Sequence, residues 1–245
     1  KGPGSDRDKL AFWREISQIF RQDYPQGFMV SEWSGPKDAL DGAFHADFFH
    51  WFDGYNDLAQ KESWRILNGF SEGHSFFDRE GKGNIARFLK AYLEQYNATK
   101  GKGYITLPLG NHDLARLNVR RTDDELEMIM AFSFAMPGVP FLYYGNEIGM
   151  RQLYDLPQIE GAYFPRSGAR TPMQWTAGPN RGFSTAAAER LYLPVDLAAD
   201  APNVEAQEKA VTSLLNRTRK LVRLKHAEPA LAAYADFTPL FAKEN

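Results

Sequence analysis

Helical and strand-like hydrophobic patterns alternate along this chain, and that alternation limits the folds it can adopt. Apolar residues recur at helical spacing over residues 6–24, 85–96, 123–136 and 205–226. Short apolar runs separate these segments, at residues 28–30, 42–46, 104–109 and 139–144. Strands that alternate with helices favour a parallel sheet whose faces are covered. We therefore predict an α/β protein.

Composition and charge exclude several classes of function. The 245 residues include 29 Lys and Arg against 31 Asp and Glu, so no basic surplus is present to neutralise a nucleic-acid backbone. The chain contains no Cys, which excludes a disulfide framework, a thiolate zinc site and a cysteine nucleophile. Its apolar runs are far shorter than the roughly 20 residues that cross a bilayer. We expect neither nucleic acid nor membrane as a partner, and localisation stays open.

Polar side chains follow the predicted strands, at the place where parallel α/β folds position their sites. Glu32 follows the first strand, and the neighbouring Trp33 would partly desolvate its carboxyl group, which suits a proton donor. Asn111, His112 and Asp113 follow the third strand. The alternative for these residues is a structural one, with Glu32 as a helix cap or ion-pair partner and Asp113 as the cap of a turn.

A metal site is not predicted. His45, Asp47 and His50 lie close in sequence, but their spacing is not one that brings ligands together on a helix. No acidic loop is dense enough to predict calcium. We therefore expect no cofactor.

Several stretches, in this order and spacing, resemble signature segments of the α-amylase superfamily of glycoside hydrolases. They are residues 31–33, 110–113 and 138–147, followed by Arg-Thr-Pro-Met-Gln-Trp at 170–175 and Gly-Phe-Ser at 182–184. The last two, with residues 213–216, resemble the α-glucosidase, oligo-1,6-glucosidase and trehalose synthase branch more than endo-acting amylases. The resemblance implies a (β/α)8 barrel, with residues 1–232 as its C-terminal half, strands five to eight, and residues 233–245 as the start of a β-domain.

The resemblance implies catalytic roles for two carboxyl groups. Glu32 falls on the family's general acid/base, and Asp113 on the carboxylate that stabilises the transition state. Retaining cleavage also needs a nucleophilic carboxylate about 5 to 5.5 Å from the acid. The family carries that Asp on the fourth strand, within Gly-x-Arg-x-Asp, and no such stretch precedes Glu32. We therefore expect the nucleophile to lie upstream and this chain to be inactive alone.

Four further residues are expected at the substrate. His112 falls on a ligand of sugar hydroxyls, and Arg170 on the arginine with which exo-acting members grip the terminal glucose. Asn111 belongs to the same stretch as His112, and Arg116 is expected to support the pocket. The expected substrate is therefore a small oligosaccharide or disaccharide.

Three alternatives remain open from the sequence. Hydrolysis of α-1,4 or α-1,6 bonds competes with isomerisation of the trehalose synthase or sucrose isomerase type. The loop over residues 148–184, including Tyr154, Tyr163 and Phe164, is expected to roof the pocket, but its sequence does not show how tightly it closes. A non-catalytic module that binds a sugar or another chain is the third alternative. Half a barrel would also expose unpaired strand edges, which favour association with another chain.

Overall fold

The computed structural model describes residues 6–49, 56–59, 75–79, 81, 83–157, 159 and 166–243. Its centre is a four-stranded sheet in the order β1-β2-β3-β4. The strands are β1 (Val30–Ser31), β2 (Ala46–Phe48), β3 (Tyr104–Pro108) and β4 (Val139–Phe141). Every neighbouring pair is parallel, with Ser31 opposite Asp47, Phe48 opposite Thr106 and Pro108 opposite Phe141. The predicted α/β architecture with a parallel sheet is confirmed.

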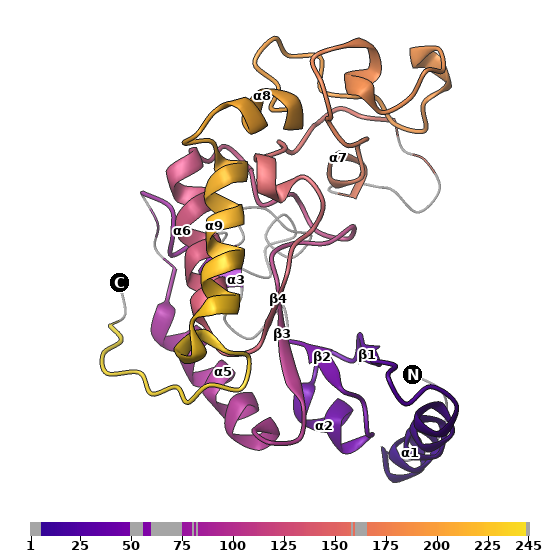
Figure 1. The fold of residues 1–245 in the computed structure, drawn as a ribbon, viewed down its shortest axis with the longest axis vertical. Coiled ribbons are helices and arrows are strands. Elements are labelled where there is room, and N and C mark those ends of the chain that lie inside the picture. The colour runs from indigo at the N-terminus through magenta and orange to yellow at the C-terminus, as the bar shows by residue number, and fades with distance from the viewer. Residues whose placement is uncertain are drawn as a thin grey trace.

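Helices precede, connect and follow these strands. They are α1 (Asp6–Asp23), α2 (Pro36–Asp41), α3 (Asn56–Ala59), α5 (Ile85–Thr99), α6 (Asp123–Ala135), α7 (Arg166–Ala169), α8 (Val204–Lys209) and α9 (Leu214–Ala227). In Figure 1, α5, α6 and α9 lie together on one side of the sheet, while α7 and α8 lie at the end of the molecule remote from α1. None of the described helices combines the length and apolar character needed to cross a membrane.

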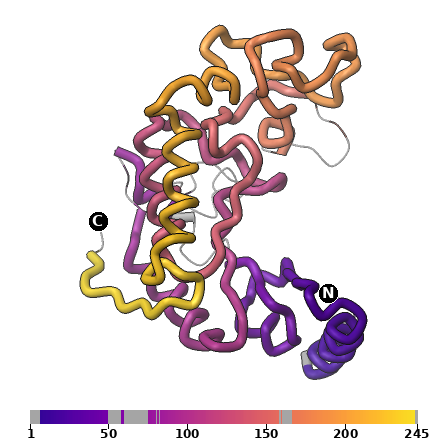
Figure 2. The backbone as a smooth tube through the Cα atoms, in the orientation of Figure 1, coloured from indigo at the N-terminus to yellow at the C-terminus, as the bar shows by residue number. Residues whose placement is uncertain are grey.

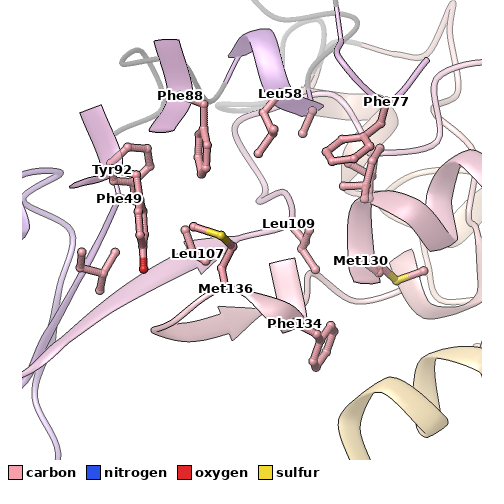
Figure 3. Close-up of a cluster of buried hydrophobic side chains, with 14 of the residues drawn as sticks. Phe49, Leu58, Phe77, Phe88, Tyr92, Leu107, Leu109, Met130, Phe134 and Met136 are labelled. Carbon is pink, nitrogen blue, oxygen red and sulfur yellow. The ribbon is translucent and has the colours of Figure 1, made fainter. Parts of the chain in front are cut away.

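The main hydrophobic core lies between β3 and the helices on that side (Figure 3). Alternate residues of the third strand and its extension face it, because side chains of a strand point to opposite faces in turn. Leu107 and Leu109 contribute from the sheet, Phe88 and Tyr92 from α5, and Met130 from α6. Each such side chain, when fully buried, stabilises the fold by about 1.5–3 kcal/mol. This core fixes β3, and with it the loop that follows β3.

The opposite face of the sheet carries an apolar groove of about 400 Å³. Its lining includes Phe28 and Val30 near the first strand, Tyr104 and Thr106 of β3, and Phe141 of β4. Figure 2 shows the tube curving around this side, with α1 and the segment over residues 166–200 at opposite ends of the curve. In the part of the chain that the structure describes, helices pack on one face of the sheet. The alternating pattern alone favours two covered faces and is not met here, whereas half a barrel is expected to leave its inner face open.

The second strand begins later than the sequence pattern indicates. The apolar run at 42–46 predicts a strand, but the strand is Ala46–Phe48. Gly42 instead ends α2, its N–H donating to the carbonyl groups of Asp38 and Leu40. Ala43 then adopts a left-handed conformation with φ of 69°, which turns the chain and cannot continue as a strand.

The predicted helix over 205–226 is two helices. The chain leaves α8 at Ala210, and the Ser213 side chain caps α9 by accepting a hydrogen bond from the N–H of Asn216. The Asn216 amide donates back to the carbonyl groups of Gln207 and Ala210, which fixes the corner. Leu214 and Leu215 are buried as expected, whereas Leu224 is exposed.

Residues 233–243 pack against helix α5. The Tyr96 hydroxyl donates to the carbonyl group of Ala235 at 2.8 Å, and Phe237 contacts the rings of Tyr92 and Tyr96 edge-on. No strand is present within these eleven residues. Their expected role as the start of a β-domain stays a prediction.

Candidate active site

A carboxylate held by two arginines marks the C-terminal end of β3. The Asp113 oxygen Oδ1 lies 3.0 Å from Nε of Arg166 and 3.1 Å from Nη2 of Arg170. Nε2 of His112 lies 3.5 Å from the same oxygen. Nε of Arg170 also donates to the His112 carbonyl group at 2.9 Å. The structure thus brings together three of the residues predicted at the site, and it fixes their geometry with charge-assisted hydrogen bonds.

The loop between β3 and Asp113 is shaped by its own sequence. Gly110 adopts φ of 127°, a conformation that side chains disfavour. The Asn111 side-chain oxygen then accepts the N–H of Asp113 at 2.8 Å, which closes a tight Asx-type turn. Asn111 was predicted to contact the substrate, and the structure places its oxygen in the turn that presents Asp113.

Arg116 lies beneath this group. Its side chain is 2% exposed, and Nη1 donates to the Tyr144 carbonyl group at 2.8 Å. The guanidinium carbon lies 4.8 Å from the centre of the Tyr144 ring and 5.5 Å from that of Tyr143, within range of a cation–π interaction. Burial lowers the pKa of Arg116, and the neighbouring tyrosines oppose that effect. Such a position suits support of the pocket rather than contact with a sugar.

The segment after β4 closes the other side of the site. Gly145 has φ of 85°, and a Cβ there would lie 2.3 Å from the Met150 sulfur atom. The buried Asn146 side chain donates to the carbonyl group of Leu109, which ties this segment to the end of β3. Burial raises the pKa of the neighbouring Glu147, while its hydrogen bonds and Arg116 lower it. The Glu147 carboxyl group is therefore easier to protonate than an exposed one.

A cavity of about 390 Å³ opens beside Arg170. Its lining includes four aromatic residues and two charged ones: Tyr144, Trp175, Phe183, Tyr192, Arg170 and Glu147. Aromatic faces with a few charged groups are typical of sugar sites, because the rings stack on the C–H faces of a pyranose while polar groups bind its hydroxyls. Arg170 belongs both to this cavity and to the Asp113 group.

Glu32 follows β1, at the same edge of the sheet, with β2 between its strand and β3. Its side chain is exposed, so the expected partial desolvation by Trp33 is wrong. The reason is that Trp33 turns away and packs edge-on against Phe44, within a small apolar cluster that includes Leu40 of α2. The structure therefore joins Asp113, His112 and Arg170, and leaves Glu32 outside their network.

Of the three candidate metal residues, only His45 and Asp47 lie within the described part of the chain. Nδ1 of His45 accepts the N–H of Met29 at 2.9 Å, and the His45 ring stacks on Phe28. Burial lowers the pKa of His45, as does the positive charge of Arg21. His50, Tyr163 and Phe164 lie outside the described residues, and Tyr154 is exposed. Among the residues described, no three His, Asp or Glu side chains form a group that could hold a metal ion.

Sequence reasoning missed Arg166. This residue starts α7, one helical turn before Arg170, and contacts the same Asp113 oxygen. Residues four apart lie on one face of a helix, so the spacing of the two arginines was the signal that could have found it.

A comparison with protein families identifies this architecture. The sequence model described as alpha amylase, catalytic domain, matches residues 8–233. The chain belongs to the α-amylase family. The resemblance drawn from its motifs is thereby confirmed, and its relatives are glycoside hydrolases and related glucoside-acting enzymes.

Curated relatives of this family match parts of the chain. The trehalose synthase/amylase TreS of Mycobacterium tuberculosis is 43% identical over 116 residues, which are 46% of this chain and 18% of that protein. A salivary alpha-glucosidase of Aedes aegypti is 32% identical over 155 residues, covering 58% of this chain and 26% of that protein. The chain thus spans only about a fifth to a quarter of the length of these relatives.

Solved structures agree on the fold. Trehalose-6-phosphate hydrolase of Bacillus licheniformis has a TM-score of 0.67 at 18% identity, covering 91% of this chain and 44% of that one. The α-amylase from H. orenii has a TM-score of 0.62 at 20% identity, covering 95% and 42%. Both are barrel enzymes of the family, and at these identities the likeness establishes the fold alone.

Proposed function

We propose that this chain supplies strands five to eight of the (β/α)8 barrel of an enzyme that cleaves α-glucosides with retention. The observation that carries the proposal is the Asp113 carboxylate, gripped by Arg166 and Arg170 at the C-terminal end of a parallel strand. Carboxylates at this end of a barrel are positioned for catalysis. The aromatic cavity beside Arg170 supports a sugar as substrate.

Each charged residue then has a role in the reaction. As the glycosidic C1–O bond breaks, the carboxyl proton of Glu32 passes to the leaving oxygen, and C1 bonds to the upstream nucleophilic carboxylate. Water, deprotonated by Glu32, later releases the sugar and restores the nucleophile. Asp113 holds sugar hydroxyls in the transition state, assisted by His112. Arg170 uses Nε and Nη2 within the site, and its Nη1 is left for a hydroxyl of the terminal glucose.

The chain alone is proposed to be inactive. Nothing in the described site replaces the attacking carboxylate, since the roles proposed for Asp113 and Glu32 are to hold sugar hydroxyls and to transfer the proton. The groove on the open face of the sheet, together with the outer edges of β1 and β4, fits the first four strands of the barrel. That half of the barrel is the proposed partner. It would pair with both edge strands, bury Phe141 and Val30, and bring the nucleophile to Glu32.

Replacement of the acid tests this function. In the protein that includes the first half of the barrel, Glu32→Gln should abolish turnover of unactivated α-glucosides and leave sugar binding largely intact. Removing a general acid typically lowers the rate by 10² to 10⁴. The rate with maltose and the dissociation constant for glucose are the two measurements. Loss of both together would mean that Glu32 is structural.

Intramolecular transglucosylation is the second candidate activity. It is favoured by one observation, the 43% identity to a protein named trehalose synthase/amylase. An isomerase must retain the released glucose and exclude water from the pocket, whereas a hydrolase must admit it. Incubation of the extended protein with maltose separates the two, because glucose alone indicates hydrolysis and trehalose indicates isomerisation. No cofactor is proposed for either reaction.

A further inference from the structure

The loop that carries Glu32 is held by a buried carboxylate from the neighbouring strand. Asp47 of β2 is 0% exposed and lies opposite Ser31 in the sheet. Its Oδ1 accepts the Ser31 hydroxyl at 2.6 Å and the Trp33 N–H at 2.8 Å, and its Oδ2 accepts the Gly35 N–H at 2.7 Å. These donors stand on both sides of Glu32 in the sequence. The Glu32 backbone is therefore bracketed by bonds to a single side chain.

Apart from these bonds, the main contact that fixes this segment is the packing of Trp33 against Phe44. The strand β1 contains two residues only, and the chain leaves it immediately before Glu32. Ser34 adopts φ of 60°, a left-handed conformation that is unfavourable for a residue other than glycine. The exposed Glu32 side chain gives the loop no anchor of its own. The position of the acid therefore depends on the three bonds that its neighbours donate to Asp47, together with the packing of Trp33 against Phe44.

Joining two strands through a buried carboxylate costs free energy. Moving a charge out of water is unfavourable unless donors satisfy it, and a well-packed apolar side chain would hold β1 against β2 without that penalty. Burial raises the pKa of Asp47, and the Ser31, Gly35 and Trp33 donors oppose this effect. All three contacts donate toward the carboxylate, an arrangement that only an acceptor with two oxygens can satisfy.

We propose that Asp47 is a positioning residue for the general acid/base, which sets where the Glu32 carboxyl group meets the leaving oxygen. This inference rests on the proposed function, and it adds a residue that the family resemblance does not supply. A displacement of about 1 Å from productive geometry can lower a rate by about 10²-fold. Asp47 does not touch the substrate. It acts through the backbone on either side of Glu32.

The test is Asp47→Asn in the protein that includes the first half of the barrel. Asn has nearly the same shape but replaces one accepting oxygen by an NH2 group, so at least one of the three donors loses its partner. Two aryl α-glucosides serve as probes, dinitrophenyl with a good leaving group and phenyl with a poor one. Cleavage of the phenyl compound needs the proton from Glu32, whereas cleavage of the dinitrophenyl compound barely does.

The expected result is a loss in kcat/KM of about 10- to 100-fold for the phenyl glucoside and less than about threefold for the dinitrophenyl glucoside. General loosening of the fold would lower both values alike, and equal losses would overturn the inference. Ser31→Ala removes one donor to Asp47 and keeps two. It should therefore also lower kcat/KM more for the phenyl than for the dinitrophenyl glucoside, but by less than Asp47→Asn does. It also carries the test if Asp47→Asn does not fold.

Two further variants separate the outcomes. Asp41→Asn removes a carboxylate that pairs with Lys102 at the surface of α2, and it should change neither rate. Glu32→Gln should show the same leaving-group dependence more strongly than Asp47→Asn. If Glu32→Gln shows none, the proposed function itself fails. If Glu32→Gln shows it and Asp47→Asn does not, only the positioning role is refuted.

Discussion

The contacts of Arg166 and Arg170 with Asp113 lead to a quantitative prediction for the substitution Arg170→Lys. Arg170 donates to the Asp113 carboxylate at 3.1 Å and to the His112 carbonyl group at 2.9 Å. A lysine keeps the charge but cannot reproduce both bonds from a rigid planar group. Loss of a hydrogen bond to a charged group that bound substrate covers is worth about 1.5–3 kcal/mol. At 1.36 kcal/mol per tenfold change, kcat/KM should fall about 10- to 150-fold.

The same substitution should hardly affect folding. The Asp113 side chain is 37% exposed, and ion pairs at that exposure contribute about 0–1 kcal/mol to stability. The assay is hydrolysis of an aryl α-glucoside by the extended protein, with thermal unfolding measured in parallel. Arg181→Lys is the matched control, because Arg181 likewise donates two hydrogen bonds from Nε and Nη2, to the carbonyl groups of Asp196 and Ala198 and not to Asp113. A kcat/KM for Arg170→Lys within threefold of the unaltered protein would refute the reasoning.

Two other predictions concern the stability of the chain. Gly145→Ala should destabilise it by about 2 kcal/mol or more, because the positive φ and the Met150 sulfur atom both oppose a Cβ. Gly35→Ala should lower the unfolding midpoint less, because a Cβ there meets no atom within 4 Å and its φ of −156° is open to any residue. His45 accepts the Met29 N–H through Nδ1, and its pKa is lowered from 6.5 in the folded state. The stability that neutral His45 contributes is therefore present above pH 6.5 and is lost as the pH falls through the lowered pKa. Thermal unfolding between pH 7 and 4.5 measures this, and a His45→Gln variant with the same pH dependence would contradict it.

Local signals in the sequence predicted three of the four long helical segments, α1, α5 and α6, to within three residues. Helix α6 begins where Thr122 and Glu125 form a reciprocal capping box, and α5 begins where Asn84 accepts the N–H of Arg87. The central strand β3 was also predicted within one residue, because its apolar run is bounded by glycines. The boundaries of these elements are set by residues within or next to them, so they can be predicted from the local sequence. Parallel pairing followed from the alternation of strands and helices.

Tertiary contacts decided the features that the sequence did not predict. The corner between α8 and α9 depends on the hydrogen bond from the Asn216 amide to the carbonyl group of Gln207. The helical spacing of apolar residues continues across this corner, so the sequence pattern does not reveal the break. The outward position of Glu32 follows from the packing of Trp33 against Phe44, which lies eleven residues further along the chain. Arg166 joins the site through a contact that is remote in the sequence, with its Nε 3.0 Å from Oδ1 of Asp113.

Joining this chain to the upstream half of the barrel tests the central claim most directly. The measurement is the rate at which an aryl α-glucoside is hydrolysed by the 245-residue chain and by the protein extended at its N-terminus. We expect no turnover by the chain alone and clear turnover by the extended protein, because we propose that the attacking carboxylate lies upstream. Clear turnover by the purified 245-residue chain would contradict it.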